Sequence, residues 1–242
     1  YGWRGIWMAV FHSISAFCNA GFDILGTENN LYPSLTGYTG SPIINITIML
    51  LIVIGGIGFL TWDDICEHKW HFHRYRVQSK VILVITGFLI VVPAAFFFFV
   101  DFSALPTGTQ LLVSFFQSVT TRTAGFNTVA LSAMSGASKG IMILLMLIGG
   151  APGSTAGGVK TTTLFVLIMS VVATIRHSKD INVFKRRMED DTARQACAVV
   201  CVYLAAFLLG TMAVCALEPA GLKEVLFEAV SYTHLTLPTI LL

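Results

Sequence analysis

The sequence predicts an α-helical membrane protein assembled from internal repeats. Of its 242 residues, 55% are hydrophobic and only 12% are charged, and the mean hydropathy is +0.77. Soluble domains carry about 25% charged residues, so a soluble fold of this size could not hide so much apolar surface. Val81 to Val100 and Ala196 to Leu217 contain no charged residue, and about 20 helical residues cross a bilayer core. Lipid is therefore the expected solvent.

The distribution of positive charge predicts how the spans are oriented. Most Lys and Arg residues lie in two loops, within 69–80 and 176–194. Such loops flanking spans are cytoplasmic by the positive-inside rule, which explains the charge without a nucleic-acid partner. The expected spans then alternate in direction, beginning with an inward one, at residues 43–60, 81–100, 139–174 and 196–217.

A short motif recurs three times along the chain. Phe11–Ser15 matches Phe116–Thr120 and again Phe227–Ser231. The first two copies continue into Asn19–Phe22 and Thr123–Phe126, and both of these segments end in Ala-Gly-Phe. Repeated membrane units commonly surround a shared axis that carries the functional site.

Two apolar pieces, at about residues 3–22 and 107–127, are too short to cross the membrane. We interpret them as re-entrant hairpins, in which a helix enters and an extended loop returns. Gly21 and Gly125 permit the positive φ that turns carbonyls toward an axis, and a ring of carbonyls can replace the hydration shell of potassium. The alternative, two interfacial loops with a glycine cap, leaves the repetition unexplained.

Residues 139–174 form a segment longer than one crossing, and glycines interrupt it near its middle. A broken helix at this depth is typical of a permeation path or gate. The residues expected in this gating loop are Gly149, Gly150, Gly153, Ser154, Thr155, Gly157, Gly158 and Lys160.

Two enzymatic interpretations of this loop compete with a gate. It is close to a phosphate-binding P-loop, but Val159 separates Gly158 from Lys160, and no strand is predicted before it. Ser154 as an intramembrane protease nucleophile would need a histidine base at similar depth, and the histidines lie outside the predicted spanning cores.

Other ionisable residues have weaker functional interpretations. Arg122 and Asp23 lie at the hairpins, where charges are commonly functional, although both could snorkel to the outer interface. We expect Arg122 to brace its loop by bonding carbonyls that face away from the ion. His68, His71 and His73 resemble a metal cluster, but their spacing fits no common site, which favours a solvated or docking surface.

Together these motifs resemble the Trk/Ktr/HKT superfamily of potassium transporters, and most closely its bacterial Ktr-type membrane subunit. The resemblance rests on residues 11–22, 115–127, 149–162 and 184–187 and extends over about 1–230. It implies repeated units of membrane helix, pore loop and membrane helix around a pseudo-fourfold pore, of which this chain holds about two and a half. The filter backbone implied by the resemblance is Asn19, Ala20 and Gly21 in one loop and Thr123, Ala124 and Gly125 in the next.

The same resemblance divides the chain into parts of that fold. They are a second repeat at 1–62, a cytoplasmic loop at 63–80, a third repeat at 81–175 with a broken inner helix at 139–175, a second cytoplasmic loop at 176–195 and the start of a fourth repeat at 196–230. We expect residues 231–242 to be a non-native tail, because they lack the glycine turn and resemble a translated sequencing adapter. The missing repeats predict that this chain is a fragment.

The implied function is potassium uptake across a bacterial plasma (inner) membrane, with sodium as an alternative ion and no cofactor in the chain. The implied partners are a second copy in a homodimer, a cytoplasmic nucleotide-binding regulatory subunit docked on loops 66–80 and 176–194, and the lipid bilayer. A membrane-embedded enzyme and a non-conducting structural subunit are the alternatives.

Overall fold

The fold is an assembly of helices connected by structured loops, seen here in a computed structural model that describes residues 2–28, 33–177, 182–183, 186–187, 190–217, 221, 225–227 and 229–230. The α-helices are α1 (Gly2–Phe17), α2 (Pro42–Gly56), α3 (Phe59–His68), α4 (Val77–Val100), α5 (Thr107–Thr120), α6 (Gly136–Leu147), α7 (Thr161–Ile175) and α8 (Asp190–Leu217). Short 3-10 helices lie at η1 (Thr36–Tyr38), η2 (Phe72–Arg74) and η3 (Leu131–Ala133), and β1 (Asn182–Val183) pairs antiparallel with β2 (Arg186–Arg187).

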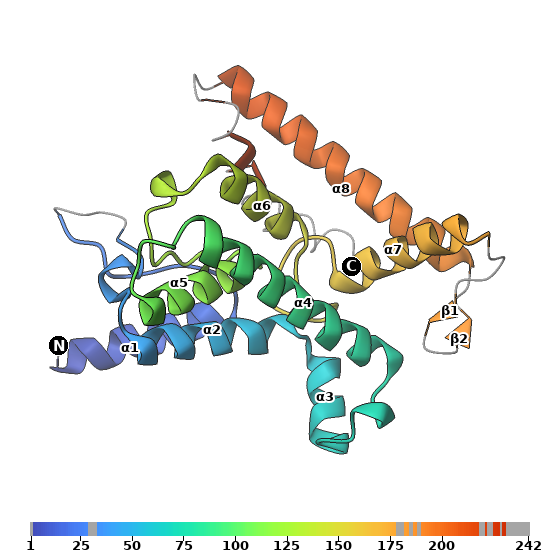
Figure 1. The fold of residues 1–242 in the computed structure, drawn as a ribbon, viewed down its shortest axis with the longest axis horizontal. Coiled ribbons are helices and arrows are strands. Elements are labelled where there is room, and N and C mark those ends of the chain that lie inside the picture. The colour runs from blue at the N-terminus through green and yellow to red at the C-terminus, as the bar shows by residue number, and fades with distance from the viewer. Residues whose placement is uncertain are drawn as a thin grey trace.

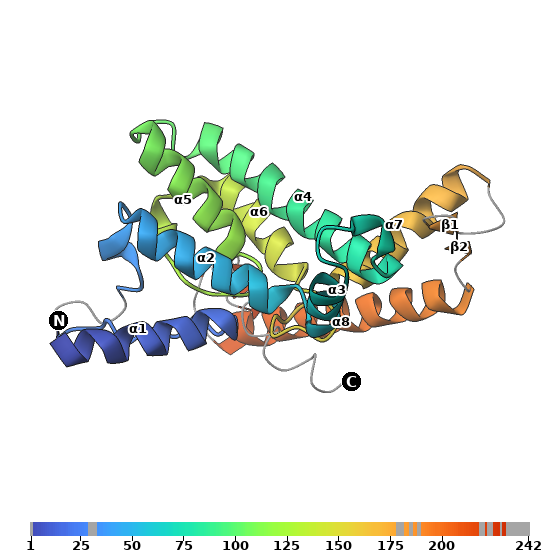
Figure 2. The same ribbon diagram turned by 90° about the horizontal axis from the view of Figure 1, so that it is seen from below.

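The two hairpin helices, α1 and α5, pack on either side of α2, and α4 covers the other face of α5 (Figures 1 and 2). The core between them is built from fully buried aromatic side chains, including Phe97 of α4, Phe116 of α5 and Phe126 of the following loop. Burying this apolar surface holds the helices that position both glycine turns.

Length and composition make α4 and residues 191–217 of α8 capable of crossing a membrane, and α2 with α3 forms a third candidate that is bent by 99°. The single inward helix expected at 43–60 therefore ends at Gly56, and α3 occupies part of the loop expected at 63–80. The bend has a physical cause in Gly58, whose φ is +83° and whose absent Cβ would lie 2.6 Å from the Pro152 carbonyl oxygen.

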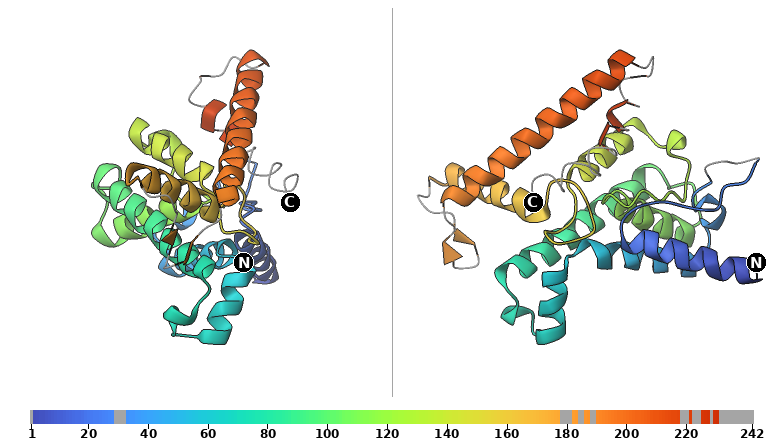
Figure 3. Two further views of the ribbon diagram at one scale, coloured as in Figure 1. Left: turned by 90° about the vertical axis from the view of Figure 1, so that its right-hand side faces the viewer. Right: turned by 180° about the vertical axis from the view of Figure 1, so that it is seen from behind.

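The segment expected at 139–174 is interrupted between α6 and α7 by the loop 148–160. Beyond it, α7 and α8 contact each other and diverge as α8 runs back across the molecule (Figure 3). The third copy of the motif is described only in part, and its Phe227 packs beside Met146 of α6. The expected tail at 231–242 lies outside the described residues.

Candidate functional site

The two glycine turns, which lie about 100 residues apart in the chain, meet in space. A Cβ added to Gly21 would lie 2.3 Å from the carbonyl oxygen of Ala124 and 2.8 Å from the Cα of Gly125. Gly125 is exposed and Gly21 is half-buried, so the backbone at their junction is accessible. No side chain larger than hydrogen fits between the turns.

The backbone of the first turn, Asn19–Gly21, repeats in the second turn, Thr123–Gly125. The φ angles are +51° and +69° at Asn19 and Gly21, and +68° and +84° at Thr123 and Gly125. A positive φ at a residue with a side chain costs free energy and persists only where the surroundings enforce it. Asn19 and Thr123, which begin the two turns, both have a positive φ. The two turns therefore share one backbone conformation.

A hydroxyl in the last turn of each hairpin helix fixes the returning loop. Ser15 Oγ donates to the carbonyl of Phe22 at 2.9 Å, and Thr120 Oγ1 donates to the carbonyl of Phe126 at 2.6 Å. Both residues lie at the same position of the repeated motif. The repeat could therefore have indicated these hydroxyls, but their hydrogen bonds to the returning loop were not predicted.

The loop 148–160 is closed at its base by backbone hydrogen bonds. Val159 donates to the carbonyl of Leu147, and Gly149 donates to the carbonyl of Val159. A Cβ on Gly149 would lie 1.5 Å from the carbonyl oxygen of Gly157, so only glycine allows the two sides of the loop to approach so closely. The break between α6 and α7 is therefore a defined structure.

This loop is hydrogen-bonded to both turns. Thr155 Oγ1 accepts from Asn19 Nδ2 at 2.8 Å and donates to the carbonyl of Phe17 at 2.8 Å. The backbone N–H of Gly157 donates to Thr123 Oγ1 at 3.1 Å. The loop also contacts the C-terminal end of α2, because Thr155 N–H donates to the carbonyl of Gly55. A movement of the loop must break these bonds.

Other residues predicted for this loop form hydrogen bonds within the loop or are buried in it. Lys160 Nζ donates to the carbonyl of Ala156 at 2.8 Å. Ser154 Oγ donates to the carbonyl of Ala151, so its hydroxyl proton is engaged within the loop. Gly150 and Gly158 are buried, whereas Gly153 is exposed.

Arg122 lies beside the second turn with 4% of its surface exposed. Its Nε and Nη2 atoms have no hydrogen-bond partner among the described residues, so the expected bonds to carbonyls are not made here. Arg122 and Asn19 line the same small cavity, together with Gly56 and Ala156, and the Oδ1 atom of Asn19 is also unpaired. Asp23 instead stabilises its own loop by accepting from the N–H of Leu25.

The histidine segment lies away from the turns, at the end of α3. His71 and His73 are exposed, with ring centroids 6.1 Å apart. His68 instead approaches Asp64 and Glu67, and the potential ligand atoms of these three residues lie within 4.8 Å of one another. Asp64 already accepts a hydrogen bond from Ser79 Oγ, so its burial beside these residues is explained without a metal.

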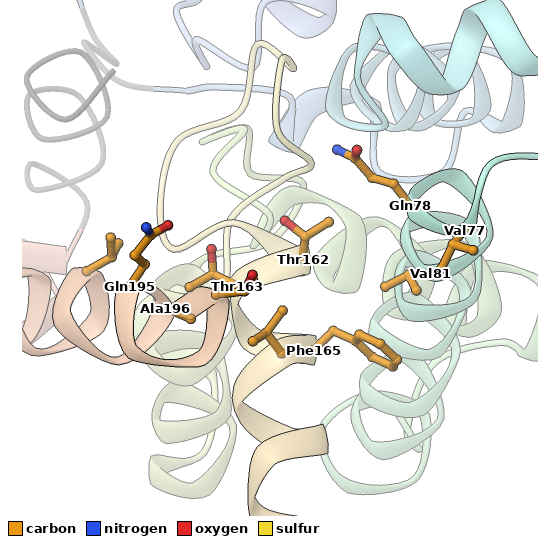
Figure 4. Close-up of a pocket in the computed structure, with 11 residues that line it drawn as sticks. Val77, Gln78, Val81, Thr162, Thr163, Phe165, Gln195 and Ala196 are labelled. Carbon is orange, nitrogen blue, oxygen red and sulfur yellow. The ribbon is translucent and has the colours of Figure 1, made fainter. Parts of the chain in front are cut away.

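A separate pocket of about 560 Å³ lies between the first turns of α4, α7 and α8 (Figure 4). Gln78, Thr162 and Gln195 contribute polar groups to walls that are otherwise largely apolar. None of the predicted turn or loop residues lines it, so it is distinct from the junction of the turns.

Comparisons with known proteins agree with this architecture. The family model TrkH, described as a cation transport protein, matches residues 1–233. The Ktr system potassium uptake protein B of Vibrio alginolyticus is 34% identical over 239 residues, which cover 95% of this chain and 51% of that protein. The potassium/sodium uptake protein NtpJ of Enterococcus hirae is also 34% identical, over 96% of this chain and 52% of its own length.

The crystal structure of the potassium transporter TrkH from Vibrio parahaemolyticus has the same fold, with a TM-score of 0.74 at 17% identity, over 97% of this chain and 58% of that one. The chain thus spans about half the length of the curated relatives named here. The fold, with its two paired glycine turns, is that of an all-α membrane transport protein, and the matching family and the named relatives are transporters and not enzymes. The chain belongs to the TrkH family of cation transport proteins.

Proposed function

We propose that this chain forms part of a potassium-uptake transporter of the bacterial plasma (inner) membrane. Its selectivity filter would use the backbone carbonyls of the first turn (Asn19, Ala20 and Gly21) and the second turn (Thr123, Ala124 and Gly125). The loop 148–160 would be the gate beneath this filter. The relatives are named for potassium or potassium/sodium uptake, which favours potassium with sodium as the competing ion.

The observation that carries this proposal is the direct contact of two turns with the same unusual backbone. Carbonyl dipoles held by such turns can coordinate a dehydrated cation. The C-terminal ends of α1 and α5 immediately precede the turns, and their partial negative charge adds to the attraction. No covalent chemistry is needed for this function.

The hydrogen bonds of the loop support its assignment as the gate. Thr155 and Gly157 join the loop to the two turns by hydrogen bonds. In this state, which would be the closed one, the non-helical backbone of the loop lies directly beside the proposed ion path. Opening would break these hydrogen bonds, and water or the ion would then satisfy the freed polar groups. Non-helical backbone at membrane depth is tolerated where it lines such a water-filled path.

The full-length protein would act as a homodimer with a cytoplasmic nucleotide-binding regulatory subunit. Of the two docking loops expected from the sequence, 176–194 would face that subunit, because its positive charge predicts a cytoplasmic position, whereas residues 69–74 of the loop 66–80 are proposed to contact lipid instead. The naming of relatives as components of a Ktr system favours such an assembly.

Complementation of a potassium-uptake-deficient bacterium by the full-length gene tests the proposal. Gly125→Leu should abolish growth at low potassium, because the new side chain would have to adopt a φ of +84° beside the Gly21 Cα. The matched variant Gly87→Leu should grow normally, since Gly87 lies exposed on α4 with nothing within 4 Å of an added Cβ. Normal growth and potassium selectivity of Gly125→Leu, at equal expression, would refute the filter assignment.

A further inference from the structure

At the inner end of α2 the chain turns aside and α3 leaves the helix bundle (Figures 1 and 3). α2 has 15 residues, which make about 22 Å of helix, less than the roughly 30 Å of a hydrocarbon core. α2 alone is therefore too short to cross the core, and the 99° bend sets α3 nearly perpendicular to it. With α2 oriented as part of a span, α3 would lie along the membrane plane.

Six consecutive exposed residues, Lys69–Arg74, follow α3, and we call them the inner tip. Trp70 is 97% exposed and Phe72 is 44% exposed. The inner tip contains two cations and no carboxylate, and it ends three residues before Val77, the first residue of the spanning helix α4. In the orientation that makes α4 a span, the inner tip would lie at the membrane interface.

The inner tip is a rigid turn. The Tyr75 hydroxyl donates to the carbonyl of Lys69, and the backbone N–H of Arg74 donates to the carbonyl of His71. Behind it, the buried carboxylate of Asp64 accepts from the N–H of Arg76 at 3.1 Å. Hydrogen bonds therefore fix the backbone around the exposed Trp70.

The nearby acidic residues leave the cations of the inner tip free. Asp63 and Asp64 both pair with Arg76, at 3.0 and 3.4 Å, and the exposed Glu67 lies 3.9 Å from His68. Lys69 and Arg74 form no ion pair with the described residues. Their charge is available to a ligand outside the chain.

We propose that the inner tip binds anionic phospholipid headgroups of the inner leaflet, with Trp70 and Phe72 at the acyl boundary and Lys69 and Arg74 on the phosphates. Tryptophan prefers the membrane interface because its ring is apolar and its N–H is polar. Basic residues next to a span attract anionic lipid, and each changes the affinity about fivefold. This interaction is independent of which ion is transported.

The fluorescence of Trp70 tests the proposal in the full-length protein, reconstituted into vesicles of phosphatidylcholine with or without 30% phosphatidylglycerol. The difference between wild type and Trp70→Phe isolates this residue from Trp3, Trp7 and Trp62, and Trp62→Phe serves as a matched control. We expect Trp70 emission to be blue-shifted and quenched by phospholipid brominated near the headgroup. Water-like emission that aqueous iodide quenches and brominated lipid does not would overturn the proposal and indicate a protein-facing surface.

Lipid selectivity tests the role of the charges. Quenching by brominated phosphatidylglycerol relative to brominated phosphatidylcholine should fall about fivefold for Lys69→Gln and again for Arg74→Gln. Arg4→Gln, which removes an exposed charge from α1, should leave the ratio unchanged. Equal ratios in wild type and both tip variants, in proteins that melt alike, would contradict headgroup binding by these residues.

Discussion

Replacing Gly21 with alanine is the smallest change that probes the junction of the two turns. The methyl group would lie 2.3 Å from the carbonyl oxygen of Ala124, closer than the 3.0 Å below which real Cβ atoms are essentially not found. The turns must therefore separate by about 0.7 Å or rotate. Either response moves the carbonyls proposed to hold the ion.

The size of the effect follows from two costs. An L-residue in the left-handed region costs about 1–2 kcal/mol, and Gly21 has a φ of +69°. Overpacking a tight contact adds about 1–3 kcal/mol. If about 1.4 kcal/mol of this total is lost from ion coordination, potassium affinity falls tenfold.

The assay is uptake of ⁸⁶Rb⁺, with sodium as competitor, into vesicles that contain the full-length protein. At subsaturating ⁸⁶Rb⁺, we expect Gly21→Ala to lower the uptake rate about tenfold or to lose discrimination against sodium. Gly87→Ala is the control, because its added Cβ meets nothing within 4 Å. If Gly21→Ala transports at the wild-type rate and with wild-type selectivity, the reasoning from this contact is wrong.

Three further changes test the supports of the site. Thr155→Val removes the hydroxyl that joins Asn19 to the loop, and it should raise ⁸⁶Rb⁺ flux in the closed state; an unchanged flux would contradict the gate. Asp101→Ala removes the acceptor for the N–H of Ser135, the N-cap residue of α6, and thermal unfolding in detergent should show a loss of about 1–3 kcal/mol from the unpaired donor. Asp64→Ala leaves buried donors unpaired and should cost about 1.5–3 kcal/mol in the same measurement, so an unchanged melting temperature would argue against a structural role.

The local features of the fold were predictable from the sequence. The uncharged run at 81–100 became α4, which begins earlier, at Val77, because Gln78, Ser79 and Lys80 are compatible with a helix. The glycine-rich stretch interrupted the segment 139–174 because chain flexibility and close approach are local properties of glycine. The repeated motif correctly indicated that the two turns have similar backbone conformations.

The contacts between distant segments were not predictable. The bond between Asn19 and Thr155 joins residues 136 positions apart, and neither periodicity nor composition contains that information. The bend at Gly58 was missed because an apolar run shows where a span lies and not where its axis turns. The burial of Arg122 without partners was also unexpected, since an unpaired buried charge is costly.

The most direct test is the position of the transported ion in the full-length protein. Anomalous diffraction from crystals soaked in Rb⁺ should place the ion within coordination distance of the backbone carbonyls of Asn19–Gly21 and Thr123–Gly125. Rb⁺ bound elsewhere in the membrane-spanning region, with no peak at these carbonyls, would contradict the assignment of the two turns as the filter.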